Sequence, residues 1–319
     1  MPHPTSALTT LRPDLGGSVE EIDLAMDRLG FIGPELLTPI DVAKQSGTFG
    51  LVTRETLLNP VKTQRAPGTP YPRGGFNFGE GSFATEEYGF EALVDHREAA
   101  IYSEFFDAEL IAAGMARDVV LRDFEDRCAT MMQNTSTFTN AARTDSFDTA
   151  ASATPIADVL TRKLHIHDAT GMWPNCVVIT RKMAEYIILT DEFIGKSQYV
   201  ANMQRGKVSY EDIRTALDVE YLLVANSIKN SANEGQTASL ESLWDDDIMG
   251  VGIKPTTTNI KEPCAGRIIH WGGDGSDIGA AMESYEETRT RSTVIRARID
   301  TDEITIVPEL WELVTGCCT

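Results

Sequence analysis

The sequence lacks long apolar runs and an excess of positive charge. None of its apolar runs approaches the roughly 20 residues that a membrane-spanning helix needs. The 319 residues include 28 Lys and Arg against 48 Asp and Glu, a formal net charge of −20. A protein of this charge repels nucleic acid and anionic membranes at long range. We therefore expect no membrane span and no specific nucleic-acid binding, and the N-terminus, without an apolar core segment, predicts no secretory signal.

Cysteine is scarce, and the common catalytic motifs are absent. The five cysteines form no C-x-x-C pair, so we interpret them as reduced cytosolic thiols, with Cys317 and Cys318 at a frayed C-terminus. The G-x-S-x-G, H-E-x-x-H and Rossmann patterns are missing. His165 and His167 lie two residues apart on a predicted helix and point to different faces, which favours local structural roles over a shared metal. We therefore predict no enzyme activity, no cofactor and no bound metal.

Two further segments leave an enzymatic alternative open. The segment WGGDGSDIG, 271–279, resembles a phosphate- or calcium-binding loop but lacks the P-loop lysine and the EF-hand glutamate, so a glycine turn is the simpler interpretation. The three aspartates at 245–247 could coordinate a cation, although consecutive carboxylates in one loop usually face water. A soluble α/β enzyme that uses both segments remains an alternative, which metal analysis with substitution of Asp274 and Asp277 would test.

The longest helical pattern runs from Ala99 to Met132 and predicts a rod about 50 Å long. Two sets of apolar residues step along it at helical spacing: Ile111, Met115 and Val119, then Val120, Phe124, Cys128 and Met131. Gly114 interrupts the pattern and costs about 1 kcal/mol relative to Ala unless something packs close to it. The other faces are rich in acidic residues, Glu125 among them, which predicts an amphipathic helix with a solvated face.

Residues 54–82 form a proline- and glycine-rich segment that is too irregular to bury and too long for an ordinary connection. The segment is locally basic in an acidic protein, so we expect a protruding loop that contacts an acidic surface. That surface would be the long helix of the same subunit or of a neighbour; a flexible surface insertion is the alternative. The candidate inter-subunit contacts come from the loop and from the helix: Arg54, Lys62, Arg65, Arg73, Glu104, Asp107, Asp118 and Asp123.

The segments before the loop are short and interrupted. Residues 1–30 are typical of an extended arm with a short amphipathic piece, Val19 to Leu29. Short strands are predicted at Ile40–Val42 and Phe49–Thr53, with a turn at Gly47.

After the long helix the pattern changes twice. The Ser-, Thr-, Ala- and Asp-rich segment 135–154 is interpreted as a linker and the main domain boundary. From Pro155 onward, helices and short buried strands alternate, which is typical of an α/β domain. Near the C-terminus, alternating patterns predict two strands, Val294–Ile299 and Glu303–Val307, around a turn at Asp300–Asp302.

The order of these parts resembles that of tailed-bacteriophage major capsid proteins with the Hong Kong 97-type fold. Local runs carry the resemblance. FIGPELLTPIDVAKQSGTF resembles the family's entry from arm to loop, and RAPGTPYPR followed by YGFEALVD resembles the loop and the segment before its spine helix. WPNCVVITRKMAEYI resembles a strand–helix pair of the axial domain, and ESYEETRTRSTVIRARIDTDEITIVP resembles the closing segment. The likeness spans nearly the whole chain.

The resemblance implies an α+β subunit of an icosahedral shell. Its parts would be an N-terminal arm, an extended loop, a peripheral domain with the spine helix, an axial domain, and return strands completing the peripheral domain: 1–48, 49–90, 91–150, 151–265 and 266–319. Copies would self-assemble as hexamers and pentamers in the host cytoplasm into the capsid of a virion, enclosing double-stranded DNA without binding it specifically.

The resemblance also implies partners and one alternative. A separate scaffold protein is expected because only some thirty residues precede the first strands, and a portal and decoration proteins are further expected partners. We predict no covalent crosslink through Lys62, because no motif identifies a partner Asn or a catalytic Glu. The alternative is an encapsulin-like nanocompartment shell, which would enclose cargo enzymes.

Overall fold

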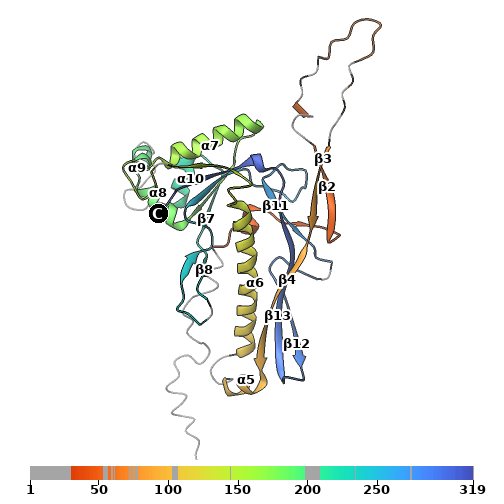
Figure 1. Ribbon diagram of the computed structural model, residues 1–319, viewed down its shortest axis with the longest axis vertical. Coiled ribbons are helices and arrows are strands. Elements are labelled where there is room, and N and C mark those ends of the chain that lie inside the picture. Colours follow the sequence, from red (N-terminus) through yellow and green to blue (C-terminus); the bar gives the residue numbers. More distant parts are fainter. Residues whose placement is uncertain are drawn as a thin grey trace, which may run out of the picture.

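Two five-stranded sheets, with helices packed on them, form the body of the protein (Figure 1). The computed structural model describes residues 30–52, 57–58, 60, 62–71, 73, 75, 78–102, 107–143, 145–197, 209–233, 235–273 and 275–318. The first sheet has the order β1 (Ile40–Asp41), β11 (Gly266–His270), β13 (Ser292–Thr305) and β12 (Ala281–Glu287), and β4 (Glu86–Asp95) also pairs with β13. The second has the order β5 (Thr139–Ala142), β14 (Trp311–Thr315), β10 (Ile248–Gly252), β6 (Cys176–Thr180) and β7 (Tyr221–Ala225). The mixed α+β class that the sequence predicts is confirmed.

The long helix α6 (Ala108–Met132) lies along β4 and β13 (Figure 1). Its 25 residues span about 37 Å. The prediction of one continuous helix from Ala99 was wrong, because α5 (His96–Tyr102) is separate and α6 begins after Asp107. The Asp107 backbone is extended, and its carboxylate accepts the Glu109 and Leu110 N–H groups at 3.1 and 3.3 Å, which caps the helix.

The first sheet is held together by β13, a single strand of 14 residues. The predicted turn at Asp300–Asp302 was wrong because the backbone of these residues pairs with β4 and β11 inside the strand. The Asp300 N–H donates to the Ser276 hydroxyl at 3.0 Å, and the Asp302 carboxylate accepts the Ala84 N–H at 2.8 Å. The strand predicted over 294–299 lies inside β13, but the predicted alternation holds only in part. Ile295, Ala297 and Ile299 are buried and Arg296 is partly exposed, whereas Arg298, expected on the solvent face, is only 8% exposed.

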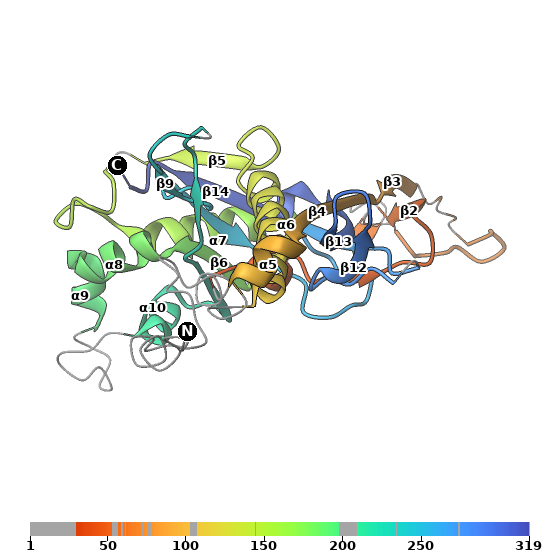
Figure 2. The same cartoon turned by 90° about the horizontal axis from the view of Figure 1, so that it is seen from below.

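Both faces of the second sheet are covered. Along β6, Cys176 and Val178 belong to the core shared with α6, whereas Val177 and Ile179 belong to a second core beneath the remaining helices. These helices are α7 (Pro155–Thr170), α8 (Arg181–Leu189), α9 (Asp191–Ser197) and α10 (Tyr210–Leu217). Figure 2 places them on the opposite side of α6 from the hairpin formed by β2 (Ser46–Val52) and β3 (Phe78–Ala84). The second half of the chain therefore forms the predicted α/β arrangement.

Segments that the sequence assigned to a linker and to the chain ends lie in the cores. Within 135–154, β5 pairs in parallel with β14, and Phe147 is fully buried. The Phe147 N–H donates to the carbonyl of Cys317, and the Cys317 N–H donates to that of Asp247, at 2.7 and 3.0 Å. The frayed C-terminus was therefore a wrong prediction, although all five cysteines are free and buried.

Two expected domain boundaries also differ from the structure. Within 266–319, strands β11 to β13 belong to the first sheet, but β14 belongs to the second, because its apolar residues pack between β5 and β10. Within 1–48, the short helix α3 (Gly33–Leu36) and β1 pack in the body, where Leu36 and Leu37 are buried, and Gly47 lies inside β2 rather than in a turn. The amphipathic piece at 19–29 lies outside the described residues.

Smaller elements complete the chain. A hairpin of β8 (Ile228–Asn230) and β9 (Leu240–Ser242) lies beside α6, and a 3-10 turn, η1 (Pro308–Leu310), precedes β14. Within the described ranges, no helix combines the length and the apolar character needed to cross a membrane.

Candidate functional site

The hairpin β2–β3 carries the basic loop away from both sheets (Figure 1). Two hydrogen bonds near its base join it to the body: the Val42 N–H, just before β2, donates to the His270 carbonyl at 2.8 Å, and the Ala84 N–H donates to the Asp302 carboxylate. Every described residue between the two strands is exposed. The loop therefore offers its side chains to solvent or to another molecule rather than to its own core.

The loop has local order around a tight turn. The Thr69 N–H donates to the Ala66 carbonyl at 3.2 Å, and Gly68, with φ +84°, supplies the left-handed conformation. The Arg65 Nε donates to the Thr69 carbonyl at 2.6 Å, and its guanidinium lies 4.8 Å from the centre of the Tyr71 ring. These contacts hold one cation of the loop in a defined position.

The candidate cations of the loop are exposed wherever the structure describes them. Arg54 lies outside the described residues, whereas Lys62, Arg65 and Arg73 are exposed. Within the described ranges, no carboxylate forms an ion pair with any of these three.

The candidate acidic residues of the helix are partly neutralised by their own chain. Glu104 lies outside the described residues, and Asp107 is exposed at the start of α6. Asp118 is only 6% exposed and pairs with Arg122 at 3.0 Å, so burial removes it from the predicted contact surface. Asp123 pairs with Arg127 one turn on, but its side chain remains 56% exposed. The acidic face of α6 is therefore smaller than the sequence suggests.

Glu125, which the sequence placed among the solvated acids, is fully buried. Its carboxylate accepts the N–H groups of Ile32 at 2.7 Å and of Gly33 at 2.8 Å, and the indole N–H of Trp244 at 2.7 Å. Burial raises the pKa of Glu125 and outweighs these hydrogen bonds, which lower it. Its position at helical spacing from Leu121 and Cys128 was the signal that sequence reasoning missed. Through these hydrogen bonds, Glu125 holds residues 32–33 and the β9–β10 connection against α6.

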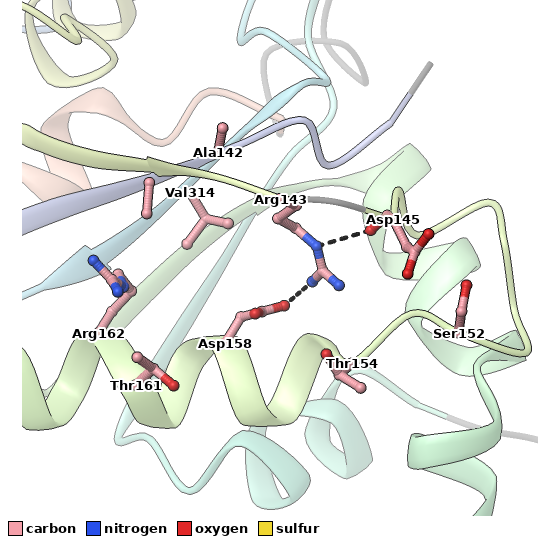
Figure 3. Close-up of a pocket in the computed structure, with 10 residues that line it drawn as sticks. Ala142, Arg143, Asp145, Ser152, Thr154, Asp158, Thr161, Arg162 and Val314 are labelled. Atoms are coloured by element: carbon pink, nitrogen blue, oxygen red, sulfur yellow. Dashed lines mark hydrogen bonds and ion pairs between the residues drawn. The ribbon is translucent and has the colours of Figure 1, made fainter.

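A polar pocket of about 350 Å³ lies between the end of β5 and α7 (Figure 3). Arg143 forms an ion pair with Asp158, and its Nε donates to the Asp145 carbonyl at 3.0 Å. Burial lowers the pKa of Arg143. Arg162, also on the wall, pairs with Glu312 at 3.1 Å. Both arginines of the pocket are therefore paired with carboxylates, and these ion pairs join α7 to the end of β5 and to β14.

The histidines that the sequence singled out occupy separate environments on α7. His165 contacts the Glu312 carboxylate, and the ring of His167 lies 5.5 Å from that of Trp173 in an edge-on arrangement. Both residues make contacts within the chain, and these contacts do not bring the two rings to a common ligand position.

The two segments of the enzymatic alternative line different pockets. Asp277 lies with Asp41 and His270 around a pocket of about 660 Å³, whereas Asp245 and Asp246 line one of about 600 Å³ beside α6. Asp274 lies outside the described residues. Across the described part of the chain, no three or more His, Cys, Asp or Glu residues are grouped so that they could hold a metal ion. Among the described residues, the two segments are therefore not brought together into one site.

Comparison with known proteins gives fold relatives only. No family model and no curated protein sequence matches the chain. Among solved structures, a phage-related protein from Bordetella bronchiseptica is similar with a TM-score of 0.65 and 18% identity, covering 94% of this chain and 98% of that one. The capsid of cyanophage P-SCSP1u is similar with a TM-score of 0.60 and 10% identity, covering 97% and 92%.

An encapsulin is among the relatives as well. The SrpI encapsulin from Synechococcus elongatus is similar with a TM-score of 0.55 and 9% identity, covering 98% of this chain and 95% of that one. The phage-related protein and the cyanophage capsid therefore have higher TM-scores than this encapsulin, and each of the three matches extends over nearly the full length of both chains. The chain has the mixed α+β fold of phage capsid structures.

Proposed function

We propose that this protein is the major capsid protein of a tailed bacteriophage, with the Hong Kong 97-type fold. Copies self-assemble as hexamers and pentamers into an icosahedral head that encloses double-stranded DNA. The observation that carries the proposal is the likeness to the cyanophage capsid over 97% of this chain. A match over nearly the whole chain supports the proposal more strongly than a match limited to one shared domain would.

The parts of the fold take roles in this proposal. Sheet β1–β11–β13–β12 with β4 and α6 forms the peripheral domain, and sheet β5–β14–β10–β6–β7 with α7 to α10 forms the axial domain. The hairpin β2–β3 carries the extended loop. A scaffold protein, a portal and decoration proteins are the proposed partners, and the acidic chain encloses DNA without specific contacts.

The contact that joins neighbouring copies is the basic loop of one copy laid across α6 of the next. Lys62, Arg65 and Arg73 are exposed cations without a carboxylate partner among the described residues, which supports an external acidic partner. Asp107 and Asp123 remain on the exposed side of α6. Each such pair contributes only about 0.2–1 kcal/mol and is screened by salt, so assembly gains strength from repetition over many copies.

Arg54 and Glu104 extend this proposed contact. Both lie outside the described residues, and their charges match the loop and helix sets to which they belong. They stay part of the prediction for the inter-subunit contact.

An encapsulin-like shell is the second candidate, favoured by the similarity to the SrpI encapsulin. Mass spectrometry of particle contents separates the two. Packaged DNA together with tail components supports the capsid, whereas a single enclosed enzyme supports the nanocompartment.

Charge reversal in the loop tests the proposed contact. The variant R65E/R73E should lose assembly in negative-stain microscopy while its thermal unfolding stays within a few degrees of the parent protein, because these side chains act between copies. The variant R97E/R289E makes the same charge change at two exposed arginines outside the loop and should still assemble. Equal loss of folding and assembly in the loop variant would contradict the placement.

A further inference from the structure

An apolar pocket of about 640 Å³ lies between the hairpin β2–β3 and the first sheet. Its volume falls within the range of about 300–1,000 Å³ that is typical of small-ligand sites. The sheet and the hairpin supply apolar side chains on opposite sides of the pocket: Ile269, Ile304 and Ile306 from the sheet, and Phe49, Leu51 and Phe83 from the hairpin.

The strand register explains the apolar floor. Ile268 on β11 belongs to the core shared with α6, and its neighbours Arg267 and Ile269 point to the opposite face of the sheet. Ile304 on β13 pairs directly with Arg267, so its side chain lies on that same opposite face. The first sheet therefore presents apolar side chains on the face turned away from α6.

The apolar walls are not packed against each other. Phe49, Leu51 and Phe83 of the hairpin are only half-buried, and so are Ile304 and Ile306 across the pocket. An apolar cavity offers water few hydrogen-bond partners, and such cavities take up apolar ligands. The pocket therefore favours an apolar occupant over water.

The third wall of the pocket, the loop at 256–263, is held rigid by buried polar groups. Arg267 is fully buried and donates to the carbonyls of Thr257 and Asn259 at 2.8 and 2.9 Å. The Glu262 carboxylate accepts the N–H and the hydroxyl of Thr256 and of Thr257, at distances of 2.7–2.9 Å. This wall is therefore formed before any ligand arrives, which lowers the entropy cost of binding.

The charges at the pocket leave one cation without a partner. The charged lining residues are Lys261, Glu262 and Arg267, and the last two form an ion pair at 3.4 Å. Burial raises the pKa of Glu262, but the hydrogen bonds from the two threonines outweigh it and lower the pKa to about 2, so the carboxylate stays ionised and balances Arg267. Lys261 is exposed, and no carboxylate of the described residues forms an ion pair with it.

From the apolar walls and the unpaired ammonium of Lys261, we infer that this pocket binds a ligand of the fatty-acid class. The aliphatic chain lies between the hairpin and the sheet, and the carboxylate lies at Lys261. The inference goes beyond the proposed function and does not depend on shell assembly, because every wall of the pocket comes from one chain.

Calorimetric titration of the full-length protein with dodecanoate, below its micelle concentration, tests the inference. We expect saturable binding of one dodecanoate per chain. The affinity should fall about fourfold for each methylene removed, so decanoate should bind about 16-fold more weakly. Dodecyltrimethylammonium has the same chain with a cationic head and should bind more weakly than dodecanoate. Equal binding of the two head groups, or no saturable binding of dodecanoate, would overturn the inference.

Replacing Lys261 tests the position of the carboxylate. K261Q should weaken dodecanoate binding about two- to fivefold and reduce its advantage over the cationic amphiphile, because an exposed ion pair is lost. K182Q is the matched control, since Lys182 is exposed on α8, away from this pocket, and should bind like the parent. An unchanged affinity in K261Q, or an equal loss in both variants, would contradict the placement.

Bulky substitutions test the location of the chain. L51W on the hairpin and I306W on the sheet side should each abolish dodecanoate binding, because the indole fills the pocket. L240W changes an exposed leucine of β9 in the same way and should bind like the parent. Thermal unfolding checks that each variant is folded, and the two pocket variants lie on different walls, so one suffices if the other fails to fold.

Two results of these variants would overturn the inference. Parental binding in folded L51W or I306W would place the ligand elsewhere. Absence of dodecanoate binding in the parent, together with loss of assembly in L51W by negative-stain microscopy, would assign the pocket to a second copy of the chain.

Discussion

Replacing Glu125 with Ala should destabilise the subunit by about 3–5 kcal/mol. The substitution leaves the N–H groups of Ile32, Gly33 and Trp244 without their buried acceptor. Each unsatisfied buried donor costs about 1–3 kcal/mol, and the surrounding atoms cannot admit water freely around a fully buried side chain.

The variant E125Q separates charge from hydrogen bonding. Oxygen Oε1 of Glu125 accepts three N–H groups, and the Gln carbonyl oxygen can keep that position. The Gln amide then replaces Oε2 and faces the Gly33 N–H, which donates to Oε2 at 2.8 Å. Losing this bond should cost about 1–2 kcal/mol.

The assay is urea unfolding followed by tryptophan fluorescence, with E109Q as the control. Glu109 is exposed on the same helix, so the change there should stay within about 0.5 kcal/mol. If E125A falls within the same range as E109Q, the account of the buried carboxylate is wrong.

The pH dependence of E125Q follows from the raised pKa of Glu125. Between the unfolded and folded pKa values, the folded protein binds more protons at this site than the unfolded chain, so its contribution to stability falls as pH rises. The contribution is fully present below the unfolded pKa of about 4.5 and is lost as pH rises through the folded pKa. As pH rises through the folded pKa of Glu125, the stability advantage of the parent protein over E125Q should therefore shrink. A growing advantage would refute the raised pKa of Glu125.

Two further predictions test the second sheet and its buried thiols. G250A should destabilise the protein by about 1–3 kcal/mol in urea unfolding, because the new Cβ would lie 2.2 Å from the Trp311 ring; a stability unchanged from the parent would contradict the packing of this ring. Burial raises the pKa of Cys317 to about 12 and that of Cys318 to about 11. Iodoacetamide at pH 8 should therefore modify neither thiol in the folded protein and all five cysteines in urea, by intact mass, and fast labelling of the folded protein would show an open C-terminus.

Much of the fold could be predicted from periodicity, and the failures have physical causes. The alternation over 294–299 predicted a strand that lies inside β13, and the Pro155-to-Gly171 pattern predicted α7, whose C-cap is Gly171 with φ +74°. The sequence could not reveal that β13 continues through Asp300 and Asp302, because the groups that bond to the Asp300 N–H and the Asp302 carboxylate come from residues 276 and 84. Similarly, the polar composition of 135–154 hid β5, which is a strand only because β14 lies beside it.

The candidate site was predictable in its loop and less so in its helix. Proline, glycine and charge content identified an exposed basic loop, since these properties act locally. Counting acids along α6 overestimated its negative surface, because Asp118 pairs with Arg122 and Glu125 turns into the core. Whether a side chain on a helix is free to contact another molecule depends on its tertiary contacts. Its position along the helix does not reveal all of those contacts.

Cryo-electron microscopy of the purified, assembled protein tests the central claim most directly. We predict a closed shell of hexamers and pentamers in which residues 62–73 of one copy contact α6 of the adjacent copy, with Arg65 and Arg73 near Asp107 and Asp123. A particle without such a lattice, or a subunit whose loop folds back onto its own body, would contradict the account.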